Sequence, residues 1–278
     1  MKHKNTIKTT ICCALLLNLI ALSAPQIISR NIASATVGQA VFCPNNYQPT
    51  ADQDGELELA NLTCIYIVDM LDNRGPNCYY SCNTTVSTYR TILAILNNYF
   101  EDNVVFSKGH RGLPYNVSHG NTNHISLLDN IGDDLIDHSD IFSRTSSENY
   151  ITFIWHCETA EKYQTGTILQ DNFGPYGMPY CWTHNQWLYC WGNSGNQVFL
   201  GWADTLQKQG SPQFLDPAEG AFNYAHVAYY FWYYMCDGDS VEDALDHTAQ
   251  TIFGDANYLA SPLKDWLVVW GDRTVELP

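Results

Sequence analysis

Two short stretches decide the fold prediction: VVFSKGHRG at Val104–Gly112 and YITFIWHCETA at Tyr150–Ala160. Each begins as a run of β-branched and aromatic residues, which is the composition of a buried strand, and each ends in polar residues or glycine. The first run ends on His110 and the second on Cys157. A thiol beside a histidine is the minimum apparatus for nucleophilic catalysis, because the thiol reacts as the thiolate. We therefore expect two neighbouring strands with His110 and Cys157 together at their carboxyl ends.

Outward from these stretches, strand signals alternate with helix signals. This alternation favours an α/β domain with a mostly parallel sheet flanked by helices. The predicted strands are 64–70, 104–107, 125–128, 151–155, 197–202 and 266–270, and the predicted helices are 85–99, 133–142, 221–236 and one that runs from its cap at Ser240 to about Phe253. The helix at 221–236 is apolar nearly all round, which predicts that it is buried, and 166–196 is expected to be a long loop.

The first residues have the pattern of an export signal. Lys2, Lys4 and Lys8 precede an apolar stretch at 11–24, and Ala33-Ser34-Ala35 is a small-residue cleavage site. We expect residues 1–35 to be a signal peptide, 36–60 a polar N-terminal extension, and 61–278 the α/β domain. An uncleaved anchor is the alternative. No membrane span is expected after signal removal, so the protein is predicted to be secreted or held at the cell surface.

The charge balance restricts the partners. The formal net charge is −16, and removal of residues 1–35 takes away four cations and no acid. Such a surface repels nucleic acid and anionic membranes, so neither is an expected partner. It would allow a structural Ca²⁺ on oxygen ligands, for which the carboxylates within 129–140 are candidates, although no EF-hand loop is present.

The chain has ten cysteines, of which Cys12 and Cys13 would leave with the signal. An oxidising destination favours disulfides, and the spacing suggests Cys78 with Cys82, Cys181 with Cys190, and Cys43 with Cys64. Cys157 and Cys236 then remain. They could form a structural bridge with each other, or Cys157 could stay reduced as a nucleophile.

Four short motifs, taken in chain order, resemble the caspase-like cysteine peptidases, the group that includes gingipains and clostripain. They are the strand ends Phe106–His110 and Phe153–Cys157, the Gly-Trp strand Phe199–Trp202, and the helix junction Asp237–Ala244. The resemblance covers roughly 62–272 in the order of the elements. It implies a caspase-hemoglobinase-like three-layer sandwich and a peptide or protein substrate, with no required cofactor.

The resemblance also implies roles for individual residues. Cys157 would be the nucleophile, and His110, which follows Gly109, would protonate the leaving amine. The backbone N–H groups of Cys157 and Arg111 would stabilise the oxyanion. Glu158 and Asp204 are candidate carboxylates for the first specificity pocket, where an acidic group selects Arg or Lys.

Two positions differ from the family pattern. Arg111 stands where the family usually has glycine, and His156 stands where it has a small residue. Both differences leave open a catalytically silent secreted relative on the same fold.

Three other interpretations compete with the Cys157–His110 pair. Cys82 precedes a predicted helix and could be the nucleophile in its place, with His110 as its partner. A carbohydrate-binding surface module could stack sugars on aromatic residues of the long loop, namely Trp182, Trp187, Tyr189 and Trp191. A metal could recruit ligands from His110, His119, His124, His138 and Cys157, although no zinc signature is present.

Overall fold

The structure is a computed structural model of the chain. It describes residues 37–43, 56–75, 77–81, 84–108, 124–126, 135–156, 159–160, 178–185, 188, 196–202 and 224–278. For residues 56–59, 124–126, 135, 137 and 138 it describes the backbone alone.

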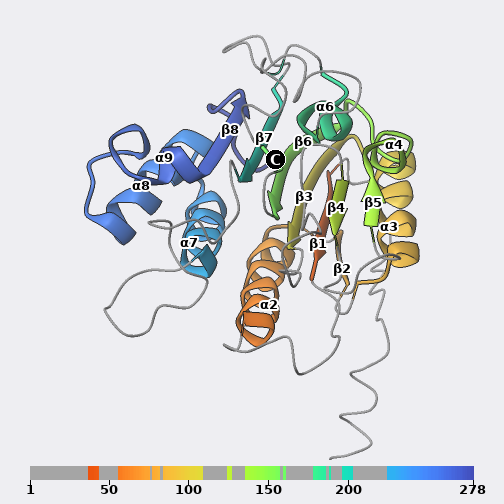
Figure 1. Cartoon of the computed structure of the whole chain (residues 1–278), viewed down its shortest axis with the longest axis horizontal. Helices are drawn as coiled ribbons and strands as arrows, with labels where there is room; N and C mark the ends of the chain where they lie inside the picture. The colour runs from red at the N-terminus through yellow and green to blue at the C-terminus, as the bar shows by residue number, and fades with distance from the viewer. Residues whose placement is uncertain are drawn as a thin grey trace, which may run out of the picture.

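A six-stranded sheet forms the centre of the molecule (Figure 1). Its strand order is β2-β1-β3-β6-β7-β8, and all neighbouring pairs are parallel except β7 with β8. The strands are β1 (Val37–Phe42), β2 (Cys78–Ser81), β3 (Asp102–Lys108), β6 (Asn149–Trp155), β7 (Val198–Trp202) and β8 (Leu267–Gly271). The predicted mostly parallel sheet is therefore confirmed.

The two strands that decided the prediction are the central pair of this sheet. β3 and β6 run parallel, and their register aligns Val104 with Ile151 and Lys108 with Trp155. Nearly every residue of both strands is buried, as the continuous apolar runs predicted.

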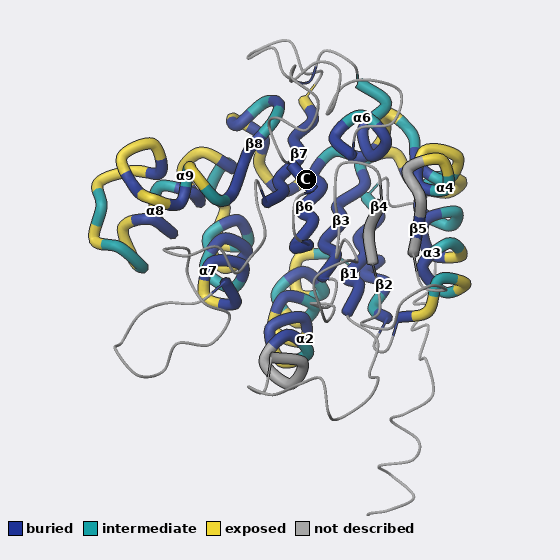
Figure 2. Tube along the Cα trace, viewed as in Figure 1, coloured by how far each residue is buried: buried dark blue, intermediate teal, exposed yellow. Residues whose placement is uncertain are grey.

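Helices cover both faces of the sheet and complete a three-layer α/β arrangement. One face packs against α2 (Glu56–Arg74), α7 (Tyr224–Asp237) and α8 (Val241–Phe253), and the other packs against α3 (Val86–Tyr99), α4 (His138–Phe142) and α6 (Met178–Thr183). The remaining short elements are α9 (Leu263–Trp266), the 3-10 helix η1 (Tyr258–Ala260) and a separate hairpin of β4 (His124–Ser126) with β5 (Leu135–Asp137). Figure 2 shows the sheet as the most continuously buried part of the molecule.

Several predicted elements agree closely with the structure. Thr85 caps α3. Five apolar residues at helical spacing predicted this helix, and four of them, Tyr89, Ile92, Leu93 and Leu96, are its buried side, whereas Val86 is only partly buried. Ser240 caps α8 by accepting a hydrogen bond from the backbone N–H of Asp243.

The prediction of a strand at 64–70 was wrong, because this segment lies within α2. Cys64, Ile67 and Leu71 are fully buried, whereas Ile65 and Tyr66 are each more than two-fifths exposed. Burial with a period of three to four residues is that of a helix packed on a sheet. The β-branched composition suggested a strand, but packing on one side of the sheet selected a helix.

The boundary between the extension and the domain was also wrong. β1 lies within the proposed extension of 36–60, yet it pairs with β2 on one side and β3 on the other. The α/β domain therefore includes residues from Val37 onward, and α2 begins at Glu56.

Three smaller predictions need correction. Within 133–142, Leu135–Asp137 is a strand and only His138–Phe142 is helical. The predicted loop at 166–196 contains the helix α6. α7 is not buried all round, since Tyr233 is 46% exposed.

The described cysteines form no disulfides. Cys43 and Cys64 were predicted to be joined, but the Cys43 thiol donates to Asn61 Oδ1 and the Cys64 thiol faces the carbonyl oxygen of Phe42 at 3.9 Å. Cys78, Cys181 and Cys236 are also thiols, so none of the predicted bridges through them is formed in the structure. Their predicted partners, Cys82, Cys190 and Cys157, lie outside the described residues.

Among the residues that the structure describes, no helix is both long and apolar enough to cross a membrane.

Candidate functional site

The candidate site is the edge of the sheet where β3 and β6 end. Lys108 and Trp155 are register partners in the last pair of these strands. His110 follows Lys108 by two residues, and Cys157 follows Trp155 by two residues. Each candidate catalytic residue therefore follows one of two adjacent parallel strands, two positions after the last pair of residues in their register. Open α/β sheets bind their ligands at this carboxyl edge.

All six residues predicted for the site lie outside the described residues: Gly109, His110, Arg111, Cys157, Glu158 and Asp204. The structure therefore does not test their predicted roles or the His110–Cys157 separation. It does describe the residues that precede and follow them.

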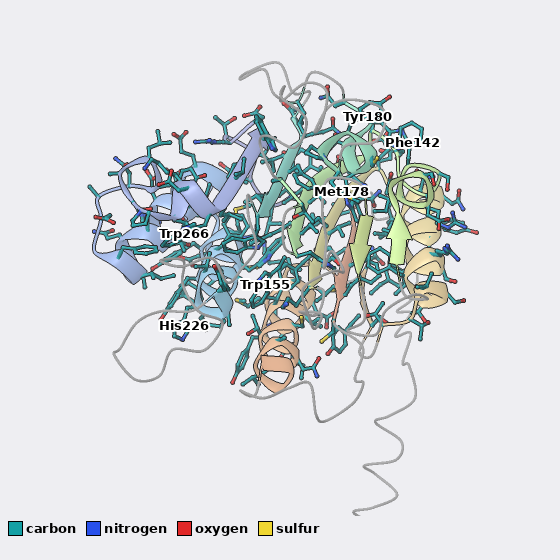
Figure 3. All side chains as sticks on the ribbon, in the orientation of Figure 1. Phe142, Trp155, Met178, Tyr180, His226 and Trp266 are labelled. Carbon is teal, nitrogen blue, oxygen red and sulfur yellow. The ribbon has the colours of Figure 1, made fainter. Side chains whose placement is uncertain are left out.

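On the face of the sheet that packs against α2 and α7, the strand ends carry Lys108 and Trp155. The Lys108 side chain is 2% exposed, and its ammonium nitrogen lies 4.9 Å from the centre of the Trp155 ring. A cation over an indole face is an attractive electrostatic contact, and it is stronger where water is excluded. Trp155 is labelled in Figure 3, where it lies beside the sheet toward α2 and α7. The Lys108 amine is therefore buried against an aromatic face at the end of β3, two residues before His110.

On the opposite face, a chain of hydrogen bonds links α3 to both strand ends. The phenol of Tyr89 donates to Ser107 Oγ at 3.0 Å, and Ser107 Oγ lies 3.1 Å from His156 Nε2. All three side chains are buried. Burial raises the pKa of Tyr89, so its phenol stays protonated and acts as a donor. His156, which the family pattern marks as unusual, therefore has an internal partner.

The chain is fixed again immediately after Cys157 and Glu158. The hydroxyl of Thr159 donates to the carbonyl oxygens of Ile154 and His156, at 3.3 and 3.2 Å, and accepts from the backbone N–H of Trp202 at 3.3 Å. The backbone N–H of Ala160 donates to the carbonyl oxygen of Trp202 at 2.9 Å. The candidate nucleophile thus stands in the sequence between two anchored positions.

Gly201 makes this second anchor sterically feasible. A Cβ added there would lie 2.9 Å from Thr159 Oγ1 and 3.0 Å from the Cβ of Ala160. The Gly-Trp motif of β7 therefore has a physical reason. Its glycine allows the segment after Cys157 to approach the strand closely, and its tryptophan provides the backbone groups that hold that segment.

Sequence reasoning missed Tyr89, Ser107 and Thr159 as supporting residues. Tyr89 was identified only as part of the apolar stripe of its helix. Ser107 carried a usable signal, because a hydroxyl inside an otherwise apolar strand needs a buried partner. Thr159 carried none, since a single threonine two residues after a cysteine is ordinary.

The alternative interpretations fare differently. Trp182, proposed to stack on sugars, is fully buried in the core with its ring edge-on to Tyr89, so it does not present a binding surface. Trp187, Tyr189 and Trp191 lie outside the described residues, as do Cys82, His110 and His119. In the described part of the chain, no cluster of three or more His, Cys, Asp or Glu side chains is arranged to hold a metal.

Three of the described thiols have pKa values that make them unreactive near neutral pH. Burial raises the pKa of Cys78 and Cys181 to about 12 and that of Cys236 to about 11. Because the thiolate is the nucleophile, these cysteines are packing residues in the native protein.

Comparisons of the chain with family models, curated proteins and solved structures gave no match.

Proposed function

We propose that this protein is a secreted cysteine endopeptidase whose catalytic dyad is Cys157 and His110. The observation that carries the proposal is the register of the central strands, since each residue follows one member of the Lys108–Trp155 pair by two positions in the sequence. The motif order that resembles the caspase-like peptidases adds support, because the strand ending in Gly201 and Trp202 is the next neighbour of β6.

The proposed reaction uses the thiolate of Cys157. Its sulfur forms a bond to the scissile carbonyl carbon, and the carbonyl π electrons move to the oxygen. The resulting oxyanion accepts hydrogen bonds from the backbone N–H groups of Cys157 and Arg111. Collapse of this intermediate breaks the C–N bond, and the leaving amine takes a proton from the His110 imidazolium. Water then attacks the thioester and loses a proton to His110, and the acid product leaves as the thiolate is restored.

Two local features would assist the thiolate. A protonated Lys108 would contribute positive charge at the end of β3, and a nearby cation lowers the pKa of a thiol. The anchors on either side, at His156 and Thr159, limit the movement of the chain that carries the nucleophile. Glu158 and Asp204 follow the ends of β6 and β7, where a carboxylate would favour a basic substrate side chain.

The test is active-site labelling with peptidyl electrophiles that carry a basic or an acidic residue next to the reactive carbon. We expect stoichiometric labelling of the purified protein by the basic probe and none of Cys157→Ala. His110→Ala should label at least about 100-fold more slowly, because general acid–base groups contribute about that much.

Cys236→Ala is the matched control, since Cys236 is a thiol on α7 that the proposed reaction does not use. It should label like the wild-type protein. Equal labelling of the wild-type protein and Cys157→Ala, or cleavage that survives the loss of Cys157, would reject the dyad. No labelling by either probe, with no cleavage of mixed peptides, would favour a silent relative on the same fold.

A further inference from the structure

We propose that Tyr89, Ser107 and His156 form a positioning relay that holds His156 as the neutral tautomer with its proton on Nδ1, and so fixes the backbone next to Cys157. The inference rests on the proposed function in taking Cys157 as the nucleophile. None of the three residues belongs to the dyad.

The proton direction follows from the donors. The Tyr89 phenol donates to Ser107 Oγ, so the serine hydroxyl must direct its own proton to another acceptor. In the described part of the chain, the other polar side-chain atom within hydrogen-bond distance of Ser107 Oγ is His156 Nε2, at 3.1 Å. Ser107 is fully buried, and an undirected buried hydroxyl proton would cost about 1–3 kcal/mol. With Nε2 as the acceptor, the imidazole proton lies on Nδ1, a buried atom for which the described side chains supply no acceptor. The opposite tautomer would leave two groups undirected, the serine proton and the Nδ1 lone pair, so it is the less favourable of the two.

The donor end of the relay is rigid. The Tyr89 ring stacks on Phe42 of β1 with centroids 3.9 Å apart, and it meets Trp182 of α6 edge-on at 6.3 Å. Tyr89 also lies in the buried face of α3. Three elements on one face of the sheet thus determine where the phenol points, and the phenol determines the direction of the serine proton.

The acceptor end lies next to the proposed chemistry. His156 directly follows β6, it is 2% exposed, and its own carbonyl oxygen accepts from Thr159. The residue that precedes Cys157 is therefore held through its ring on one side and through its carbonyl group on the other. A small residue at this position could make only the carbonyl contact. The relay gives a reason for histidine at 156.

The relay can be tested in the full chain by nitrogen-15 NMR of the histidine rings together with the rate of Cys157 alkylation by the basic peptidyl electrophile, whose reaction requires an aligned site. In the wild-type protein at neutral pH, we expect a His156 signal of the Nδ1–H tautomer, with Nε2 in the range of an unprotonated, hydrogen-bonded ring nitrogen. Ser107→Ala should lose this signature. It should also slow alkylation of Cys157 by about 10-fold or more, because misplacement by about 1 Å can cost about 100-fold.

Conservative variants separate positioning from folding. Ser107→Thr keeps the hydroxyl and should retain both the tautomer signal and the alkylation rate, whereas Tyr89→Phe keeps the ring and removes the donor. We expect Tyr89→Phe to produce mixed tautomers in a folded protein. Thermal unfolding of each variant confirms that the native state is present.

The outcomes distinguish the two proposals. A His156 proton on Nε2 in the wild-type protein, or an unchanged alkylation rate in Ser107→Ala, would overturn the relay and leave the dyad standing. Absence of Cys157 alkylation in the wild-type protein would overturn the dyad and the positioning role with it, whereas the NMR signal would still report the tautomer.

Discussion

At the scale of single residues, close packing around Gly201 leaves no room for a side chain. Its missing side chain lets Thr159 and Ala160 lie against β7, and a Cβ would also lie 2.8 Å from the ring of Phe199. The neighbours on both sides are buried, so they have little room to move.

We predict that Gly201→Ala destabilises the protein by about 1–3 kcal/mol, the usual cost of overpacking a core, and lowers any Cys157 reactivity in the molecules that remain folded. Chemical denaturation and alkylation kinetics would measure the two effects. Gly75→Ala is the control, since the nearest atom to its Cβ is the end of the Gln39 side chain at 3.1 Å. Equal stability of Gly201→Ala and Gly75→Ala would contradict the steric argument.

The sequence allowed the positions of the candidate residues to be predicted but not the way they are supported. The ends of the runs at Val104 and Ile151 indicated where each strand would stop, because apolar composition changes to polar there. His156 looked like a departure from a pattern. Its contact with Ser107 joins residues that are 49 positions apart, and only a known register brings them together.

At the scale of elements, helices with clear caps were predictable and short ones were not. Thr85 and Ser240 begin α3 and α8 with side-chain caps, and Gly254 ends α8 in the left-handed conformation with φ of 72°. These signals are local. α2 was mistaken for a strand because its composition is β-prone, and its periodic burial depends on the sheet beneath it.

The junction of α4 with α6 supplies a pH-dependent element. His184, just after α6, stacks on Phe142 of α4 with ring centroids 4.0 Å apart, and its Nε2 lies 3.1 Å from Thr145 Oγ1. Figure 3 labels Phe142 and Tyr180 close together at this junction. Burial lowers the pKa of His184 below its usual value of 6.5, and a hydrogen bond with the backbone of Phe142 offsets part of that shift.

The sign of the pH effect follows from this shift. At a pH between the folded and unfolded pKa values of His184, the unfolded chain binds the proton more readily than the folded protein. The stability of the folded state that depends on neutral His184 is therefore complete above about pH 6.5 and is lost as the pH falls below that value. We predict that His184→Asn shows a smaller loss of melting temperature between pH 8 and pH 5 than the wild-type protein. Asparagine suits the position because the φ of residue 184 is 54°, in the left-handed region that asparagine adopts more readily than most residues.

Phe142→Leu is the matched control for that comparison, because it removes the ring contact and keeps the titrating group. It should be less stable at both pH values, and its pH dependence should lie between those of the wild-type protein and His184→Asn, because the ring supplies part of the burial that lowers the pKa of His184. Thermal unfolding followed by circular dichroism at each pH measures all three proteins. An unchanged pH dependence in His184→Asn would show that other groups dominate the acid response.

At the scale of the whole molecule, alternation of strands and helices was enough to predict a mostly parallel sheet flanked by helices, because each element must bury its apolar side against another. The strand order was not predictable. β1 lies between β2 and β3, so the chain crosses over β1 between its second and third strands in the sheet. The strand β1 was not predicted because the polar turn formers at 44–55 led to the assignment of the whole segment 36–60 as an extension.

The position of β1 leads to a prediction about the domain boundary. A chain that begins at Thr36 keeps β1, whereas one that begins at Pro44 loses it, together with the buried side chains of Ala40, Val41 and Phe42. Burial of a single Val or Phe side chain is worth about 1.5–3 kcal/mol, and the whole domain is expected to be stable by only about 5–15 kcal/mol. Both sheet partners of β1 would also lose their hydrogen bonds to it.

We therefore expect the chain from Thr36 to unfold cooperatively and the chain from Pro44 to lack a cooperative transition and to expose apolar surface. Differential scanning calorimetry and binding of a hydrophobic dye would compare the two. The chain from Thr36 is the control for the loss of residues 1–35, which the sequence pattern predicts to be an export signal. A cooperative transition at the same temperature in both chains would show that the sheet tolerates the loss of an inner strand, and the domain would then begin near residue 61, as the sequence had suggested.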